Sequence, residues 1–182
     1  MNKEDGWKEM KNISNTIIFK FVIILIGILI SFLSYQFIKD VISIEFIIKV
    51  FKNKGNLFYI LILIPLHEYS HAIIYPKFGL SDKTIIGIWP KKFVLYSYYV
   101  GTLKRNRLIL AMLNPIIILT VIPVILIAVF KLNYVSLAII TLMNPIGGAG
   151  DIFYSILIIT QIPKNSLVKT DTSRVFWKKE SS

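Results

Sequence analysis

Four long apolar segments dominate this sequence, and each could cross a lipid bilayer as a helix. They cover Ile17–Phe37, Leu57–Tyr75, Leu108–Phe130 and Val135–Ile159. A spanning helix needs roughly 20 largely apolar residues to cross about 30 Å of hydrocarbon. The sequence therefore predicts one all-α integral-membrane domain over residues 1–182, with four transmembrane helices.

The composition supports a membrane protein and excludes several other classes. Hydrophobic residues make up 55% of the chain, charged residues only 17%, and the mean hydropathy is +0.67. With no cysteine, the chain has no disulfides, thiolate nucleophile or thiolate metal ligands. The net charge of +11 comes from residues that flank the apolar segments, a pattern typical of membrane topology and not of nucleic-acid binding.

The distribution of basic residues predicts the orientation of the chain. Most of the 21 lysines and arginines lie in the N-terminal tail, in the loop between the second and third segments, and after the fourth segment. Cytoplasmic loops carry such an excess, so we expect a multi-pass protein of the cell membrane. Both termini and the tail 163–182 are then cytoplasmic. We also expect Ile17–Phe37 to be a retained anchor, because its apolar stretch is too long for a signal peptide.

Two shorter elements are predicted outside the spans. Residues 84–89 and 93–99 are rich in β-branched and aromatic side chains and flank Pro90, which predicts a short β-hairpin between the second and third spans. The hairpin could anchor at the membrane interface through its aromatic residues, or offer an edge strand to an extended substrate. Val41–Phe51 has the pattern of a short interfacial helix.

The second segment contains the pattern H-E-x-x-H as His67-Glu68-Tyr69-Ser70-His71, with the only two histidines of the chain. Residues four apart share one face of a helix, so His67 and His71 can bind one metal ion. The pattern indicates zinc, which lowers the pKa of bound water toward roughly 7. Glu68 can then act as the catalytic base.

The third zinc ligand is predicted to be Asp151. A catalytic zinc usually has three protein ligands, and here a carboxylate must supply the third. Asp151 is the ionisable residue of the fourth segment. His67 lies ten residues before Lys77, and Asp151 lies ten residues before Gln161. At about 1.5 Å per residue, each therefore sits roughly 15 Å in from the cytoplasmic side. The alternative is small-residue helix packing in which Asp151 pairs with a lysine.

The approach to Asp151 is rich in glycine. Residues Asn144 to Asp151 include Pro145 and three glycines, which predicts interrupted backbone at the site. Asn144 is a candidate substrate-orienting residue, for a carbonyl or an oxyanion. The alternative for Asn144, and for Asn114 in the third segment, is a hydrogen bond to a neighbouring helix.

These motifs resemble the site-2 protease class of intramembrane zinc metalloproteases. The chain is also similar to a family of small bacterial membrane proteins described as putative zincin peptidases. The resemblance covers roughly Leu57 to Ile159, and it implies His67, His71 and Asp151 as ligands with Glu68 as base. The chain departs from the site-2 pattern where Asn144 and Pro145 are adjacent and where Ile152, not glycine, follows Asp151.

The sequence thus predicts a membrane-embedded zinc metallopeptidase. Its partners would be membrane lipids and a peptide substrate cleaved in or near the inner face of the membrane. One alternative is a peptidase that cuts soluble or juxtamembrane segments. The other is a non-enzymatic membrane scaffold or immunity-type protein with an idle motif.

Overall fold

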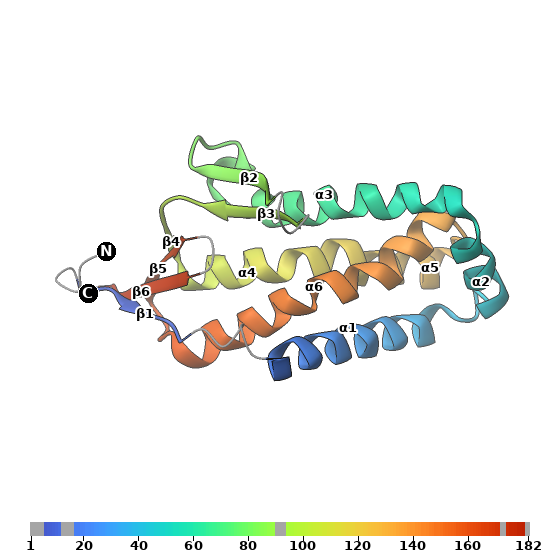
Figure 1. Ribbon diagram of the computed structural model, residues 1–182, viewed down its shortest axis with the longest axis horizontal. Helices are drawn as coiled ribbons and strands as arrows, with labels where there is room; N and C mark the ends of the chain where they lie inside the picture. Colours follow the sequence, from blue (N-terminus) through green and yellow to red (C-terminus); the bar gives the residue numbers. More distant parts are fainter. Residues whose placement is uncertain (1–5, 12–16, 90–93, 172–173, 181–182) are drawn as a thin grey trace.

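A computed structural model describes residues 6–11, 17–89, 94–171 and 174–180. Helices run along the long axis of the molecule, a small sheet lies at one end, and a strand pair lies along one side (Figure 1). The helices are α1 Ile17–Ile38, α2 Ile44–Lys52, α3 Leu57–Ile73, α4 Arg105–Ile116, α5 Ile122–Phe130 and α6 Val135–Gln161. The strands are β1 Lys8–Glu9, β2 Thr84–Trp89, β3 Val94–Tyr99, β4 Thr102–Lys104, β5 Ser166–Asp171 and β6 Arg174–Lys179.

Three helical segments within the described residues are long and apolar enough to cross a membrane. They are Ile17–Ile38, Arg105–Phe130, which joins α4 and α5, and Val135–Gln161. The chain therefore has the features of a membrane protein. The fourth predicted span, α3, has 17 residues and is about 25 Å long, which is shorter than the hydrocarbon layer. That α3 also crosses the membrane stays a prediction.

Helix α6 occupies the middle of the bundle and contacts α1, α3, α4 and α5. Its contact with α1 is close because Gly27 lies directly against α6. A Cβ atom added at Gly27 would lie 2.8 Å from the Cα atom of Ile146 and 3.1 Å from the carbonyl oxygen of Pro145. Small residues allow two helix backbones to approach in this way.

The predicted interruption before Asp151 is wrong, because α6 continues through Pro145 and the glycines without a break. In apolar surroundings the backbone has no water to bond, so helical hydrogen bonds outweigh low helix propensity. The irregular backbone lies in a different segment. A π-helical turn, Ile117–Val121, follows Pro115 and joins α4 to α5.

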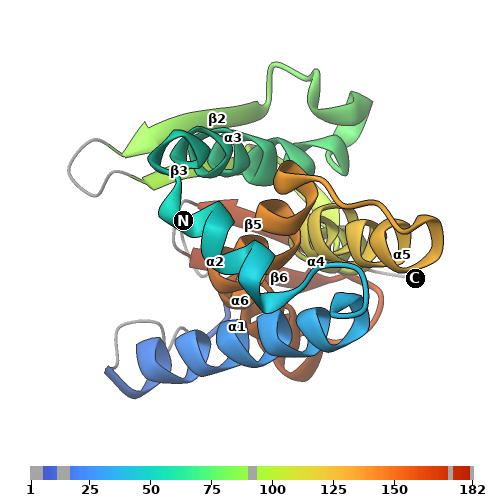
Figure 2. The same ribbon diagram turned by 90° about the vertical axis from the view of Figure 1, so that its right-hand side faces the viewer.

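Strands β2 and β3 pair antiparallel between α3 and α4 in the chain, in a register from Thr84 opposite Tyr99 to Trp89 opposite Val94. The predicted turn at Pro90 lies outside the described residues. The pair packs beside α3, on the side of the molecule away from α1 (Figure 2). Gly87 gives room to the ring of Tyr96, whose hydroxyl oxygen lies 2.6 Å from where a Cβ atom would be.

A second sheet was not predicted, and it corrects the expected all-α fold with a single hairpin. Its four strands follow the order β1-β6-β5-β4. The tail expected over residues 163–182 thus contains the antiparallel strands β5 and β6. The sequence could not show this sheet because β1 and β4 are very short and are distant in the chain from β5 and β6.

The four-stranded sheet fixes the ends of the helices that carry the predicted site. Leu103 and Val168 of the sheet belong to one buried cluster with Tyr75, which follows α3, and with Ile158 and Ile162 at the end of α6. This cluster lies just beyond the H-E-x-x-H motif on one helix and just beyond Asp151 on the other. The sheet therefore holds α3 and α6 side by side at the level of the site.

Candidate metal centre

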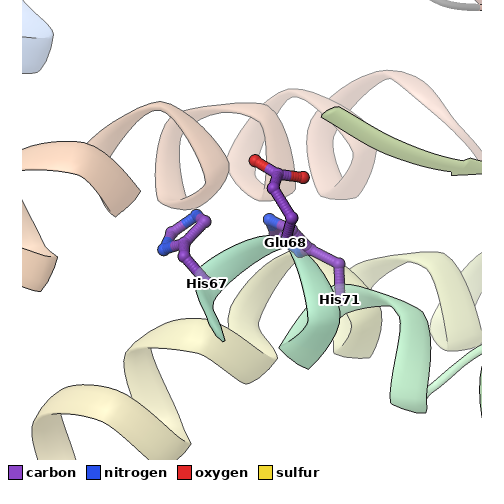
Figure 3. Close-up of side chains that lie close together, drawn as sticks. All are labelled: His67, Glu68 and His71. Atoms are coloured by element: carbon purple, nitrogen blue, oxygen red, sulfur yellow. The ribbon is translucent and has the colours of Figure 1, made fainter. Parts of the chain in front are cut away.

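The side chains of His67, Glu68 and His71 project from α3 at one place (Figure 3). One ligand atom of each lies within 4.8 Å of the others. Helix α6 adds Asp151, whose Oδ2 atom lies 3.0 Å from His67 Nε2 and 3.5 Å from His71 Nε2. The structure therefore brings together the four residues predicted from the motif and from the depth of Asp151. These ion-pair partners of Asp151 are histidines, whereas the alternative interpretation expected a lysine.

The hydrogen bonds of the two histidines determine which ring nitrogen carries the proton. His71 Nδ1 lies 2.8 Å from the carbonyl oxygen of Ala111, which can only accept, so Nδ1 must donate. His67 Nδ1 lies 2.9 Å from Asn144 Oδ1 and donates to it. In both neutral rings Nε2 then carries the lone pair and faces Asp151.

Three electron-pair donors thus converge on one point: two Nε2 atoms and a carboxylate oxygen. Without a cation between them they would repel one another, so the arrangement requires protons or a metal ion. Ligand atoms about 2.0–2.1 Å from a tetrahedral zinc lie about 3.3 Å apart, close to the observed 3.0 and 3.5 Å. Two imidazoles and one carboxylate are also a known ligand set of catalytic zinc. The residues present fit a zinc ion.

The candidate site is open on one side. The side chain of His71 is 5% exposed, that of His67 14% and that of Asp151 21%. A catalytic zinc needs a fourth position for water or substrate, and a structural zinc does not. A cavity lined by His67 and Glu68 leaves room for such a position, as a site of the catalytic kind requires.

Asn144 holds His67 in place. Its Nδ2 atom donates to the carbonyl oxygen of Pro115 at 3.0 Å and to Thr120 Oγ1 at 2.9 Å. Since the Pro115 oxygen is an acceptor only, the Oδ1 atom must face His67. Thr120 lies in the π-helical turn, and such turns often occur at functional sites. Asn144 is 2% exposed, and its amide makes the hydrogen bonds to neighbouring helices that the alternative interpretation predicted. Asn144 also lines the cavity beside the site, so its role toward substrate stays a prediction.

We expect Asn144→Ala to weaken zinc binding by about 10–100-fold, because outer partners orient the ligating histidine and set its tautomer. Competition with a chromogenic chelator measures this affinity in purified protein. The matched control is Thr141→Val, which changes another fully buried polar residue of α6 whose hydroxyl has no partner among the described residues. Equal zinc affinity in the two variants would show that Asn144 does not support the site.

Asn114 connects α4 to the motif, as one of the two interpretations of this residue predicted. Its Nδ2 atom donates to the carbonyl oxygen of Ser70 at 2.6 Å. The Ser70 hydroxyl in turn donates to the carbonyl oxygen of His67 at 2.7 Å. Ser70, one of the two variable positions of the motif, therefore links α3 to α4 through its carbonyl oxygen.

Ser97 was missed by the sequence interpretation. Its hydroxyl lies near the Glu68 carboxylate, and it is buried without a clear hydrogen-bond partner among the described residues. Tyr75, also missed, directs its hydroxyl toward the carbonyl oxygen of Ser97 at 3.5 Å. The alternation of side chains along β3 could have indicated this position, because Leu95, Ser97 and Tyr99 share one face of the strand. That face turns toward α3.

The fold and the site together define a class: a mainly helical membrane protein with an H-E-x-x-H metal-binding group. The chain belongs to the family described as "Putative zincin peptidase", which matches residues 60–167. The matched residues include the motif, the strand pair, and Asp151. No curated protein and no solved structure matches the chain.

Proposed function

We propose that this protein is a zinc metallopeptidase whose active site lies in the membrane. The observation that carries the proposal is the convergence of His67 Nε2, His71 Nε2 and Asp151 Oδ2 with Glu68 beside them. Membership of the zincin family supports the same chemistry. We also propose that the protein is similar in mechanism to bacterial site-2-type proteases.

In the proposed mechanism His67, His71 and Asp151 hold the metal. When bound, zinc polarises the carbonyl group of the scissile bond and makes water a nucleophile near neutral pH. Glu68 accepts the proton of the attacking water and delivers it to the leaving amine. Ala111 and Asn144 keep both imidazoles in the required tautomer.

The proposed location is near the inner face of the cell membrane, in a multi-pass protein with both termini in the cytoplasm. Strands β1 and β6 pair at the sheet end of the bundle, so the described residues nearest the two termini lie on the same side. Basic residues gather there, including Lys104, Arg105 and Arg107, and basic residues mark the cytoplasmic side. The motif and Asp151 lie in the halves of α3 and α6 nearest this end (Figure 1).

The test of this function combines metal analysis with a search for cleaved peptides. We expect purified protein to contain about one zinc per chain, in keeping with a single site. Membranes that express the wild type should gain new protein N-termini that are absent with Glu68→Gln, and their positions separate cleavage within the membrane from cleavage beside it. Zinc-free wild type would favour the non-enzymatic scaffold or immunity-type alternative.

A further inference from the structure

A cavity of about 350 Å³ opens beside the candidate metal centre, between α3, β3 and α6. His67 and Glu68 form its reactive end. Most of the remaining wall is apolar and includes Ile64 of α3, Leu95 of β3 and Met143 of α6. A group bound at this end of the cavity would lie next to the residues to which we assign the chemistry.

We propose that this cavity binds an apolar side chain of the substrate next to the bond that is cut, and that Gly147 sets the size it accepts. The inference rests on the proposed peptidase function and names its specificity. The volume is near the lower limit of ligand pockets, roughly 300–1,000 Å³, which suits one side chain with its backbone. A charged side chain would lose its hydration against the apolar part of the wall, and the polar lining residues are confined to His67, Glu68 and Asn144 at the reactive end.

Gly147 lines the cavity, and its missing side chain leaves the space open. A Cβ atom added there meets nothing within 4 Å. The neighbouring Gly148 differs, because its Cβ atom would lie 2.9 Å from Ile116 Cδ1 and 3.2 Å from His67 Cε1. A side chain at position 147 would therefore start in open space at the wall of the cavity, whereas one at position 148 would displace His67. We expect a leucine at position 147 to occupy part of the cavity without moving His67.

Gly150 provides a matched control on the same helix. An added Cβ atom there also meets nothing within 4 Å, and Gly150 is not among the residues that line the cavity. Both Gly147→Leu and Gly150→Leu replace a poor helix former by a good one, so neither should disturb α6. The pair separates loss of the cavity from a general effect on the helix.

The first measurement is binding, which needs no turnover. The probes are hydroxamates with methyl, isobutyl and benzyl groups, added to zinc-loaded protein in calorimetry. We expect wild type and Gly150→Leu to bind the benzyl hydroxamate about 10-fold or more tighter than the methyl hydroxamate. In Gly147→Leu this difference in affinity should disappear while the zinc content stays unchanged. An unchanged difference in Gly147→Leu, or no size-dependent binding in wild type, overturns the proposal.

The second measurement is cleavage of synthetic peptides that differ at one central residue, which is alanine, leucine, phenylalanine or aspartate. We expect wild type to prefer leucine and phenylalanine, and Gly147→Leu to shift toward alanine by about 10-fold or more. Glu68-dependent cleavage with the same preference in both proteins overturns the pocket but not the peptidase. A different outcome is that hydroxamate binding depends on size, that Gly147→Leu abolishes this dependence, and that no peptide is cleaved. This result would support the pocket and overturn the peptidase.

Discussion

Glu68→Gln is expected to slow peptide hydrolysis by about 10²–10⁴-fold, the contribution typical of a positioned general base. Glutamine has nearly the same shape but cannot accept the proton of the attacking water. Zinc should stay bound, because the three atoms that converge belong to His67, His71 and Asp151. Turnover of a cleaved peptide and the zinc content of the same preparation check both parts.

The matched control is Glu45→Gln, which changes an exposed glutamate in the first turn of α2. It should leave turnover and zinc content at wild-type levels. A carboxylate oxygen of Glu68 lies within 4.8 Å of a ring nitrogen of each histidine, so Glu68 could itself bind the metal. The zinc content of Glu68→Gln therefore decides whether Glu68 is a base or a ligand. If Glu68→Gln loses the metal together with activity, then Glu68 is a ligand and the assignment of the base is wrong.

Asp151→Asn is expected to weaken zinc binding by more than about 100-fold, beyond the 10–100-fold cost of losing an outer partner of a ligand. The substitution keeps the size of the side chain but removes the one negative charge among the three proposed ligands. Two neutral imidazoles then face an uncharged amide. Competition with a chelator measures the affinity, and analysis of the purified protein measures occupancy.

Asp171→Asn is the control for this variant, because Asp171 forms an ion pair with Arg174 in the β5–β6 hairpin and is about 58% exposed. It should keep wild-type zinc affinity. Full zinc occupancy in Asp151→Asn would remove Asp151 from the ligand set. A third ligand would then have to be sought in Glu68, the other acid of the site.

The residues of the site could be predicted from the sequence because their chemistry is local or constrained by the membrane. His67 and His71 lie one helical turn apart, so the spacing alone predicts that they face one ion. Asp151 followed from depth, since few positions in an apolar helix tolerate a carboxylate without a function. The structure brings these three side chains together, and their role as zinc ligands stays a prediction until metal is measured.

A hydrogen bond from Asn144 or Asn114 to a neighbouring helix was one of the interpretations, but the particular partner atoms could not be predicted. Each partner depends on how the helices pack. Asn144 meets His67 only because α6 lies beside α3, and Gly148 permits the contact by leaving room for the ring. Ser97 lies near Glu68 only because β3 packs on α3. Sequence periodicity gives the face of an element but not the neighbour that covers it.

The glycines before Asp151 show why propensity misled the prediction. In water they would weaken a helix, and the sequence suggested broken backbone. In the structure Gly148 admits His67, and Gly147 leaves the adjoining cavity open. Their value lies in the missing side chains and not in backbone freedom.

The pairing of β1 with β6 has a consequence for the order in which the protein matures. The sheet that aligns α3 with α6 takes strands from the first and the last parts of the chain, and Asp151 is carried by the last helix. While the ribosome is still delivering the earlier helices to the membrane, the histidines have no carboxylate from α6. A nascent chain therefore cannot complete the cluster until α6 has been synthesised and has packed against α3.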